Sequence, residues 1–396
     1  MQDMLITDQV QWEQLCQEIR AAGIVAFDTE FVSEFTYRPE LCLLQFAIPG
    51  RLAAVDPFAV SDLTPWWDLM TDDRTTIVVH GGREEVRFCL TATDKPPRKL
   101  VDIQIAEGLR SPSFPLSYAN LLQRVLGVNV GNHQTRTDWR KRPLRTEQIE
   151  YAVEDVEYVL PAWEKQSADL TQLGRASWAE TEFQRLIEDA LSERSPDSWT
   201  RLSGLHKLKP RSLEAARQLY FWRQGIAEQT NRPLRRILRD DLLVDLARRL
   251  PQSRQQVLAN RDMGRTEYQR HVGDILECLD RVRQVPDSDL PRFPERQALE
   301  RNQDDQVLGK LLGIALANRC AEMSVSLSLV GTTSDLRELV RTRVYGHQFE
   351  TPPRLSVDWR AEVCGDLLAD VMDGKVALRV VNPKSEYPLA FERRDK

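Results

Sequence analysis

Three apolar, β-prone segments lie close together near the N-terminus, and they constrain the fold more than any other feature of the sequence. The segments are IVAFDTEF at residues 24–31, LCLLQFAI at 41–48 and RLAAVDP at 51–57. Short breaks separate them, and the last break contains a Pro-Gly turn signal, so the spacing predicts an antiparallel meander. A further apolar run, TIVVH at 76–80, leads into a helical pattern. This alternation of strands and helices is typical of an α/β domain.

The pattern changes near Thr146, beyond which apolar residues recur at helical spacing through most of the chain. A chain of 396 residues also exceeds the length, about 250–300 residues, at which single hydrophobic cores stop growing. Within the last 91 residues, segments 306–327 and 358–372 read as helices, and 375–381 fits either a short strand or a helix end. The predicted organisation is 1–195 for the α/β domain, 196–284 for a helical domain, 285–305 for a Pro- and charge-rich linker, and 306–396 for a C-terminal helical domain.

Composition excludes several classes of protein. No apolar run approaches the roughly 18 residues of a membrane helix, and the N-terminus lacks the layout of a signal peptide, so we expect a cytoplasmic protein with no membrane partner. The six cysteines are scattered without a CxxC or Cys/His cluster, which argues against structural zinc and disulfides. The net charge of −6 gives no global basic footprint. Any contact with nucleic acid must therefore come from local patches, such as 136–145 and 201–239.

Asp28 and Glu30 lie two residues apart in the first β-prone segment. Because side chains alternate between the faces of a strand, both carboxylates are expected to project from the same face. Like charges held so close repel, and a divalent cation is one of the few partners that reverses that cost. An ordinary solvated strand also accommodates such a pair, so the pair alone decides nothing.

Two further acidic elements follow along the chain. Tyr151 and Asp155 lie four residues apart in the predicted helix YAVEDVEYVL, so they share one face. Glu84 and Glu85 begin the helix that follows TIVVH. Each element also has a structural explanation: an aromatic packed beside a solvated acid, and acidic residues that suit a helix N-terminus.

Together and in this order, the three elements resemble the Exo I, Exo II and Exo III motifs of the DEDD exonuclease superfamily, with the YxxxD spacing of its DEDDy branch. The segments FDTEF, TYRPELCLLQ, TRTDWRKRPL and QIEYAVEDVEYVLP are similar to ribonuclease D. The block at 199–262 resembles an HRDC domain, a helical module of ribonuclease D and RecQ helicases. The last block is similar to the C-terminal, second HRDC-like domain of ribonuclease D proteins.

The resemblance implies an RNase H-like α/β exonuclease domain, with a mixed sheet flanked by helices, followed by all-α HRDC-type domains. It implies a 3′–5′ exoribonuclease that uses two divalent ions, Mg²⁺ or Mn²⁺, and releases 5′-mononucleotides. By resemblance, Asp28 bridges both ions, Glu30 and Asp155 complete the site that activates water, Glu85 supports the second ion, and Tyr151 orients the water. One position departs from the family, because Glu85 stands where the second motif has aspartate, which keeps the charge and adds a methylene.

Several residues are candidates for substrate contact. Phe31 would stack on the terminal base, although core packing explains it equally well. Trp139 and Arg142 belong to a basic patch beside the third motif, for which a solvated loop is the alternative. Core residues of the HRDC-like block are expected at Leu202, Leu205, Leu208, Leu219 and Trp222. An exposed basic face is expected at Arg235, Arg236 and Arg239.

The expected partner is RNA with a single-stranded 3′ end, with tRNA precursors as the natural substrate, and no obligate protein partner is implied. Two other readings stay open at this point. One is a DNA 3′–5′ exonuclease of the same superfamily, since no residue that reads a 2′-hydroxyl is identifiable. The other is a non-catalytic RNA-binding protein whose metal site Glu85 has weakened.

Overall fold

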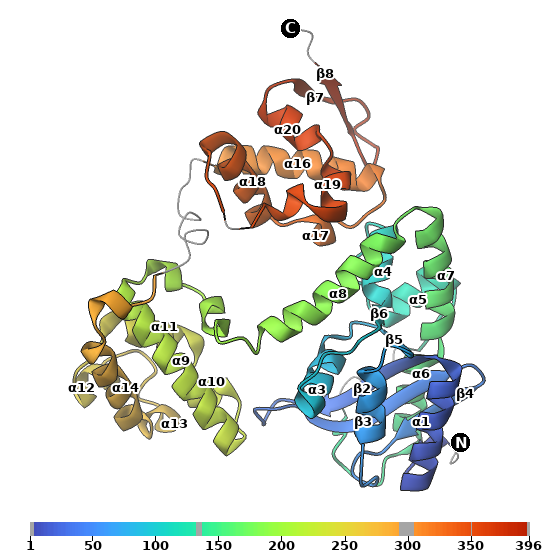
Figure 1. Ribbon diagram of the computed structural model, residues 1–396, viewed down its shortest axis with the longest axis horizontal. Coiled ribbons are helices and arrows are strands. Elements are labelled where there is room, and N and C mark those ends of the chain that lie inside the picture. The colour runs from blue at the N-terminus through green and yellow to red at the C-terminus, as the bar shows by residue number, and fades with distance from the viewer. Residues whose placement is uncertain (1–3, 132–136, 293–304, 350, 394–396) are drawn as a thin grey trace.

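The computed structural model describes residues 4–131, 137–292, 305–349 and 351–393. Figure 1 shows three parts, which we call the sheet region, the middle helical region and the C-terminal region. The sheet region lies at the lower right, the middle helical region at the lower left and the C-terminal region at the top. Among the described residues, no helix is long and apolar enough to cross a membrane.

A mixed six-stranded sheet organises the first part of the chain, in the order β1-β4-β3-β2-β5-β6. The predicted meander is confirmed, because β3 pairs antiparallel with both β2 and β4. The other neighbours pair in parallel, including two edge strands too short to give a periodic signal. The strands are β1 (Leu5–Ile6), β2 (Ile24–Val32), β3 (Glu40–Ile48), β4 (Arg51–Val55), β5 (Thr76–Val79) and β6 (Leu100–Asp102).

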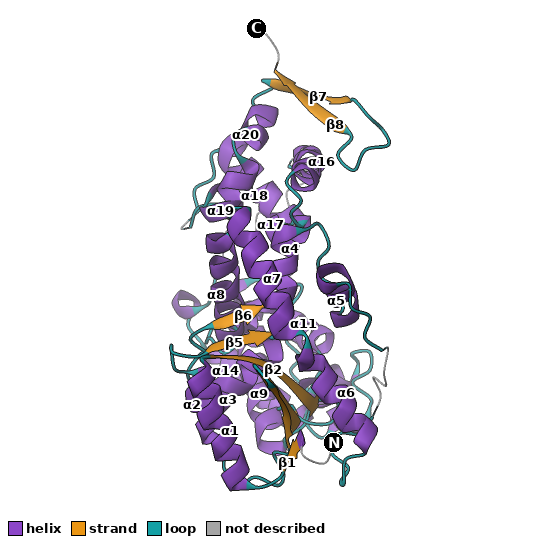
Figure 2. Cartoon of the chain, turned by 90° about the vertical axis from the view of Figure 1, so that its right-hand side faces the viewer, coloured by secondary structure: helices purple, strands orange, loops and turns teal. Residues whose placement is uncertain are grey.

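Helices cover both faces of this sheet, as Figure 2 shows. On one face, Val25, Phe27 and Phe46 pack under α1 (Gln9–Ala22), α2 (Thr64–Met70) and α3 (Arg83–Thr93). On the other face, Leu43 and Ala54 pack under α6. The strand period of two therefore places Asp28 and Glu30 on the α6 side. The remaining helices of this part are α4 (Ile103–Arg110), α5 (Tyr118–Leu126), α6 (Thr146–Glu157), α7 (Val159–Gln172) and α8 (Ala176–Ser192).

The middle helical region has a hydrophobic core of its own, drawn from residues 199–282. Leu202, Leu205, Leu208 and Leu219 are buried in it and Trp222 packs against it, as the sequence predicted. Its elements are the short helices η2 (Ser198–Arg201) and η3 (Leu205–Lys207), then α9 (Pro210–Thr230), α10 (Leu234–Ile237), α11 (Asp240–Arg249), α12 (Arg254–Leu258), α13 (Thr266–Gln269), α14 (Val272–Gln284) and η4 (Asp287–Asp289).

The C-terminal region is helical apart from one hairpin. The segment predicted as 358–372 is two helices, because Gly365, with a φ of 49°, breaks it. Of the two alternatives for residues 375–381, the structure shows the strand, Val376–Val380, which pairs antiparallel with Leu389–Arg393 in a hairpin beside the helices. The elements are α16 (Gln306–Glu322), α17 (Leu327–Val330), α18 (Thr333–Tyr345), η6 (Arg354–Ser356), α19 (Asp358–Cys364), α20 (Leu367–Met372), β7 (Val376–Val380) and β8 (Leu389–Arg393).

The two helical parts attach to the sheet region differently. The C-terminal region shares a continuous hydrophobic core with α4 and α8, in which the rings of Trp178 and Trp359 stack at 5.1 Å. The middle helical region meets the sheet region through polar contacts near β2, including a 2.7 Å hydrogen bond from the Tyr37 hydroxyl to Gln224. Most of the predicted linker lies outside the described residues.

Candidate active site

Strand β2 carries the first acidic pair into the space under α6. Asp28 lies opposite Gln45 of β3, and Glu30 lies opposite Leu43. The register shifts between Glu30 and Phe31, which marks an irregularity immediately after the pair. Such irregularities re-aim side chains, and they are common beside active sites.

Helix α6 brings Tyr151 and Asp155 to the same space. Ala152, Val153 and Val156 are buried, and α6 packs across β2, β3 and β4. This buried stripe fixes the rotation of the helix. The Tyr151 hydroxyl lies near enough to the Asp155 carboxylate to offset part of the rise in its pKa, so these two side chains share one face as expected.

The third acidic element enters from the first turn of α3, after a tight turn at Gly81 and Gly82. A Cβ at Gly82 would lie 2.2 Å from Val79 Cγ2, so only glycine fits there. The backbone amides of both glycines donate to the Asp102 carboxylate at 3.1 and 3.0 Å, which fixes the turn. The result is a defined register for the two glutamates that follow.

Glu85, and not Glu84, is the glutamate that turns toward β2. The Glu85 side chain is buried, and its Oε1 accepts a 2.7 Å hydrogen bond from the hydroxyl of Thr29, the residue between Asp28 and Glu30. Glu84 instead pairs with Arg87 on the helix surface. Nothing in the local sequence pattern identified Thr29 as a partner, because the two residues are 56 positions apart.

Burial raises the pKa values of all four carboxyl groups, and the charges of the neighbouring site carboxylates raise those of Asp28 and Glu30 further. Burial is the largest cause, and it brings the pKa to about 8 for Glu30, about 7 for Glu85 and about 6 for Asp155. The pKa of Asp28 is raised well above its usual value, by burial and then by the charges of the other three. Four acidic groups in one poorly solvated space are unfavourable unless protons or a cation neutralise them.

The donor set fits a hard divalent cation. All four side chains offer carboxylate oxygens, the ligands that Mg²⁺ and Mn²⁺ prefer. Within the described ranges, no three His, Cys, Asp or Glu side chains already have the geometry of a ready-made metal site. The Glu85 carboxylate is held by Thr29, so it would have to turn toward a cation before it could ligate one.

Comparisons with known proteins agree with this geometry. A family model described as 3′–5′ exonuclease matches residues 4–170, and an HRDC domain model matches residues 212–279. Ribonuclease D of Sphingobium indicum is 30% identical over 383 residues, covering 96% of each chain.

The chain belongs to the ribonuclease D family.

Another ribonuclease D, from Zymomonas mobilis, is 29% identical over 96% of each chain. The crystal structure of Escherichia coli RNase D, an exoribonuclease involved in structured RNA processing, matches with a TM-score of 0.82 and 25% identity, over 93% of this chain and 98% of that one. The predicted fold class and the resemblance to ribonuclease D are thus confirmed. As a ribonuclease D, the chain is a 3′–5′ exoribonuclease and acts on RNA, and its exonuclease fold family is metal-dependent.

Among the candidate substrate residues, Phe31 has surroundings that fit both predicted roles, stacking on the terminal base and packing in the core. It is partly exposed beyond the acidic pair, and its ring meets that of Phe88 edge-on at 5.7 Å. Trp139 is only 7% exposed, and its ring lies 6.3 Å from that of Tyr151. Trp139 therefore packs against α6, in one buried cluster with Ala152 and Val153, and little of its surface is open to a substrate.

The structure gives Arg142 a different role from the predicted one. Its guanidinium donates to both oxygens of Asp56, at 2.5 and 2.7 Å, and to the carbonyl oxygens of Cys42 and Trp139, at 2.7 Å each. It also lies over the ring of Phe58. These contacts tie the segment before α6 to the sheet, so the proposed contact with phosphate is not supported.

The other residues of the predicted basic patch differ in how available they are to a phosphate. Arg140 pairs with Asp138 at 3.0 Å, and Arg136 lies outside the described residues. Lys141 is exposed. A cleft of about 470 Å³ opens beside the site, and its lining joins Trp139 and Tyr151 to Thr137, Gln148 and four glutamates of α6, Glu147, Glu150, Glu154 and Glu157.

Proposed function

We propose that this ribonuclease trims the 3′ ends of structured RNAs such as tRNA precursors by a two-metal mechanism, releasing 5′-mononucleotides in the cytoplasm. The observation that carries the proposal is the gathering of four carboxyl groups from β2, α3 and α6 beside Tyr151, with Glu85 buried and the other three partly buried. Their mutual repulsion would be offset by two divalent cations, Mg²⁺ or Mn²⁺.

Each acidic residue has a distinct part in this proposal. Asp28 would hold both ions, Glu30 and Asp155 would complete the ion on the side of the attacking water, and Glu85 would hold the ion on the leaving-group side. Once bound, such ions lower the pKa of a coordinated water and stabilise charge on the entering and leaving oxygens. The extra methylene of Glu85 would let it release Thr29 and extend toward its ion.

Tyr151 is suited to orient a water molecule. Burial and the neighbouring carboxylates raise the pKa of its phenol, so the hydroxyl stays protonated at neutral pH. A protonated phenol fixed by Asp155 can exchange hydrogen bonds with the attacking water while remaining uncharged. We therefore assign Tyr151 to positioning and not to proton removal.

The helical parts would guide the RNA 3′ end to this site. Support comes from the segment directly after β2, where the Tyr37 amide donates to Asn231 at 3.1 Å and Arg38 pairs with Glu228 of α9. The middle helical region is thus attached next to the acidic strand. Arg236 and Arg239 are engaged with Glu267 and with Asp241 and Asp262, which leaves exposed Arg235 as the better phosphate contact. The proposed division remains 1–195, 196–284, 285–305 and 306–396.

Product analysis on matched substrates tests the proposal. The protein would be incubated, with Mg²⁺ or Mn²⁺, with a 5′-labelled tRNA precursor carrying a 3′ extension, and with single-stranded RNA and DNA of one sequence. We expect stepwise shortening of both RNAs, release of 5′-mononucleotides, little cleavage of DNA, and no reaction in excess chelator. Faster cleavage of the DNA would favour the DNA exonuclease reading, and reaction in chelator would refute the metal mechanism.

A further inference from the structure

Gln45 is a fully buried amide that the proposed mechanism does not use. It lies in the middle of β3, its side chain is 0% exposed, and neither its Nε2 nor its Oε1 has a hydrogen-bond partner among the described residues. Buried polar side chains nearly always have partners, because an unpaired donor or acceptor loses its bonds to water without compensation. An amide kept in this condition calls for a functional explanation.

The position of Gln45 in the sheet points to its partner. Gln45 lies directly opposite Asp28 in the antiparallel pair of β3 and β2, so both side chains project from the same face. Opposed residues on one face have Cβ atoms about 4.5–5.5 Å apart, a separation that an amide and a carboxylate can span with a hydrogen bond. On its other side, Gln45 lies opposite Ala54 of β4, which offers no polar atom from its side chain.

Apolar packing surrounds the amide elsewhere. Leu43 and Ala54 on this face join Ala152 and Val153 of α6 in one buried cluster. The acidic site is therefore the polar direction open to Gln45. An ordinary core position under α6 would favour an aliphatic side chain, which fills the same volume without unpaired polar atoms.

We propose that Gln45 is a positioning residue of the metal site, whose Nε2 donates a hydrogen bond to the Asp28 carboxylate when that carboxylate binds cation. The bond holds one oxygen of Asp28 and leaves the other aimed at the ion, as outer partners of metal ligands commonly do. This inference rests on the proposed role of Asp28 as a metal ligand.

Binding of Mn²⁺, followed by the electron paramagnetic resonance signal of the free ion, tests the inference without an activity assay. Gln45→Met replaces the amide by an apolar side chain of similar length. We expect about a tenfold rise in the Mn²⁺ dissociation constant. The metal-free variant should melt at the same temperature as the parent or higher, because an unpaired buried amide has been removed. Gln45→Asn, which keeps an amide, should bind Mn²⁺ more tightly than Gln45→Met.

Gln166 offers a matched control. It is also 0% exposed, but its Nε2 donates to the Ile103 carbonyl and to Glu107, both at 3.1 Å, away from the acidic strand. Gln166→Met should lower the melting temperature and leave Mn²⁺ affinity unchanged. A dissociation constant for Gln45→Met within twofold of the parent, while Asp28→Ala abolishes binding, would overturn the role of Gln45. Unchanged binding in Asp28→Ala would instead refute the proposed metal site itself.

Discussion

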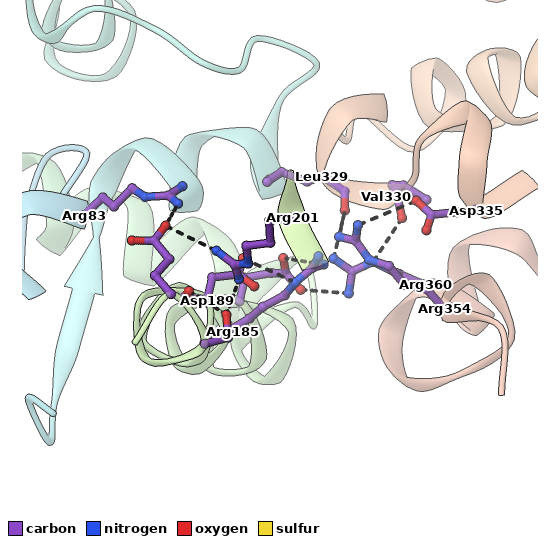
Figure 3. Close-up of polar contacts among 12 residues, drawn as sticks. Arg83, Arg185, Asp189, Arg201, Leu329, Val330, Asp335, Arg354 and Arg360 are labelled. Carbon is purple, nitrogen blue, oxygen red and sulfur yellow. Dashed lines mark hydrogen bonds and ion pairs between the residues drawn. The ribbon is translucent and has the colours of Figure 1, made fainter. Parts of the chain in front are cut away.

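Two groups of buried or partly buried carboxylates in this molecule have opposite surroundings. On α8 and at its C-terminal end, each is met by cations of the chain: buried Glu182 accepts from Arg360 at 2.8 Å, and partly exposed Glu193 accepts from Arg83, Arg87 and Arg201. Figure 3 shows polar contacts in this part of the molecule, from Arg83 of α3 past Arg185 of α8 to Arg360 of the C-terminal region. In the acidic site, Asp28, Glu30, Glu85 and Asp155 have no ion pair with any described basic residue, and the charges of their neighbours in the site raise the pKa values of Asp28 and Glu30.

The difference separates structural charge from functional charge. A carboxylate whose charge the chain neutralises fixes geometry, and at Glu182 and Glu193 it fixes how the helical parts meet the sheet region. A carboxylate whose charge the chain leaves unpaired destabilises the fold and is available to a ligand. Substitutions in the two regions should therefore have opposite effects on stability and activity.

The largest expected effect is on catalysis, from the unpaired group. Asp28→Ala should lower the rate on single-stranded RNA at least about ten-thousandfold, about 5.4 kcal/mol, because it removes the ligand shared by both ions. Its metal-free melting temperature should equal or exceed that of the parent, since one repelling charge is gone. Rate measurements and thermal melting check both parts. A variant that melts well below the parent would contradict the comparison.

The paired region should respond in the opposite way. Arg360→Met leaves Glu182 buried without its cation and should cost about 3–5 kcal/mol of unfolding free energy, with the rate per folded molecule unchanged. Arg185→Met, on the same helix as Glu182, is the control. Arg185 is partly exposed and its nitrogen lies 3.9 Å from the Glu182 carboxylate, so its loss should cost under about 1 kcal/mol of unfolding free energy. Denaturant unfolding measures both. Equal costs for the two variants would show that burial of the pair is unimportant.

Glu84 and Glu85, adjacent in α3, show the same contrast between a paired and an unpaired carboxylate within one helical turn. Glu85→Ala should raise the Mg²⁺ concentration for half-maximal activity about tenfold or more, because a charge that holds the leaving-group ion is lost. Glu85→Asp should preserve activity, and Glu84→Ala should change little, since Glu84 pairs with Arg87 and not with the acidic site. Magnesium titrations of the three variants decide this. Identical Mg²⁺ dependence in Glu85→Ala and the parent would remove Glu85 from the site.

The smallest expected effect is a pH dependence of stability in the metal-free protein. The folded pKa values of Asp155, Glu85 and Glu30, about 6, 7 and 8, exceed the values near 4 of unfolded chains. Their contribution to stability is fully present below about pH 4 and is lost as pH rises through 6–8. The melting temperature in chelator should fall over this range by at least about 2–4 °C, the shift for each 1 kcal/mol.

Bound Mg²⁺ should make the melting temperature depend less on pH. Glu193 should change the pH dependence of stability in the opposite direction from the acidic site. Burial alone would raise the pKa of Glu193, but hydrogen bonds from Arg87 and Arg83 hold it below its usual value. Its contribution is present above the unfolded pKa and is lost as pH falls through the folded one. Glu193→Gln should therefore reduce stability at neutral pH more than in acid. A metal-free melting temperature that rises between pH 6 and 8 would contradict the account of the acidic site.

The sequence predicts those features of the site and the fold that depend on residues close together along the chain. The sequence predicts that two pairs of side chains each share one face, because the period of a strand or a helix brings residues two or four positions apart together. These pairs are Asp28 with Glu30, and Tyr151 with Asp155. The β2-β3-β4 meander is readable for the same reason. Each of these features depends on residues a few positions apart, and no distant partner has to be known.

Features that depend on distant partners were missed. Arg142 looked like a phosphate contact because its partner, Asp56, lies 86 residues away. No local pattern indicates that Thr29 holds Glu85, or that Glu182 meets Arg360. The second strand of the hairpin β7-β8 was also missed, because it is a short segment whose pairing depends on its neighbour and not on its own pattern.

The shared core of the sheet and C-terminal regions has a consequence for synthesis on the ribosome. The apolar surface around Trp178 forms early, but the segment that covers it is translated much later, since 177 residues separate Glu182 from its partner Trp359. At roughly 5–20 residues per second, the nascent chain carries this surface uncovered for roughly 10–35 seconds. Translation speed through the middle helical region therefore sets how long this apolar surface of the growing enzyme is open to aggregation.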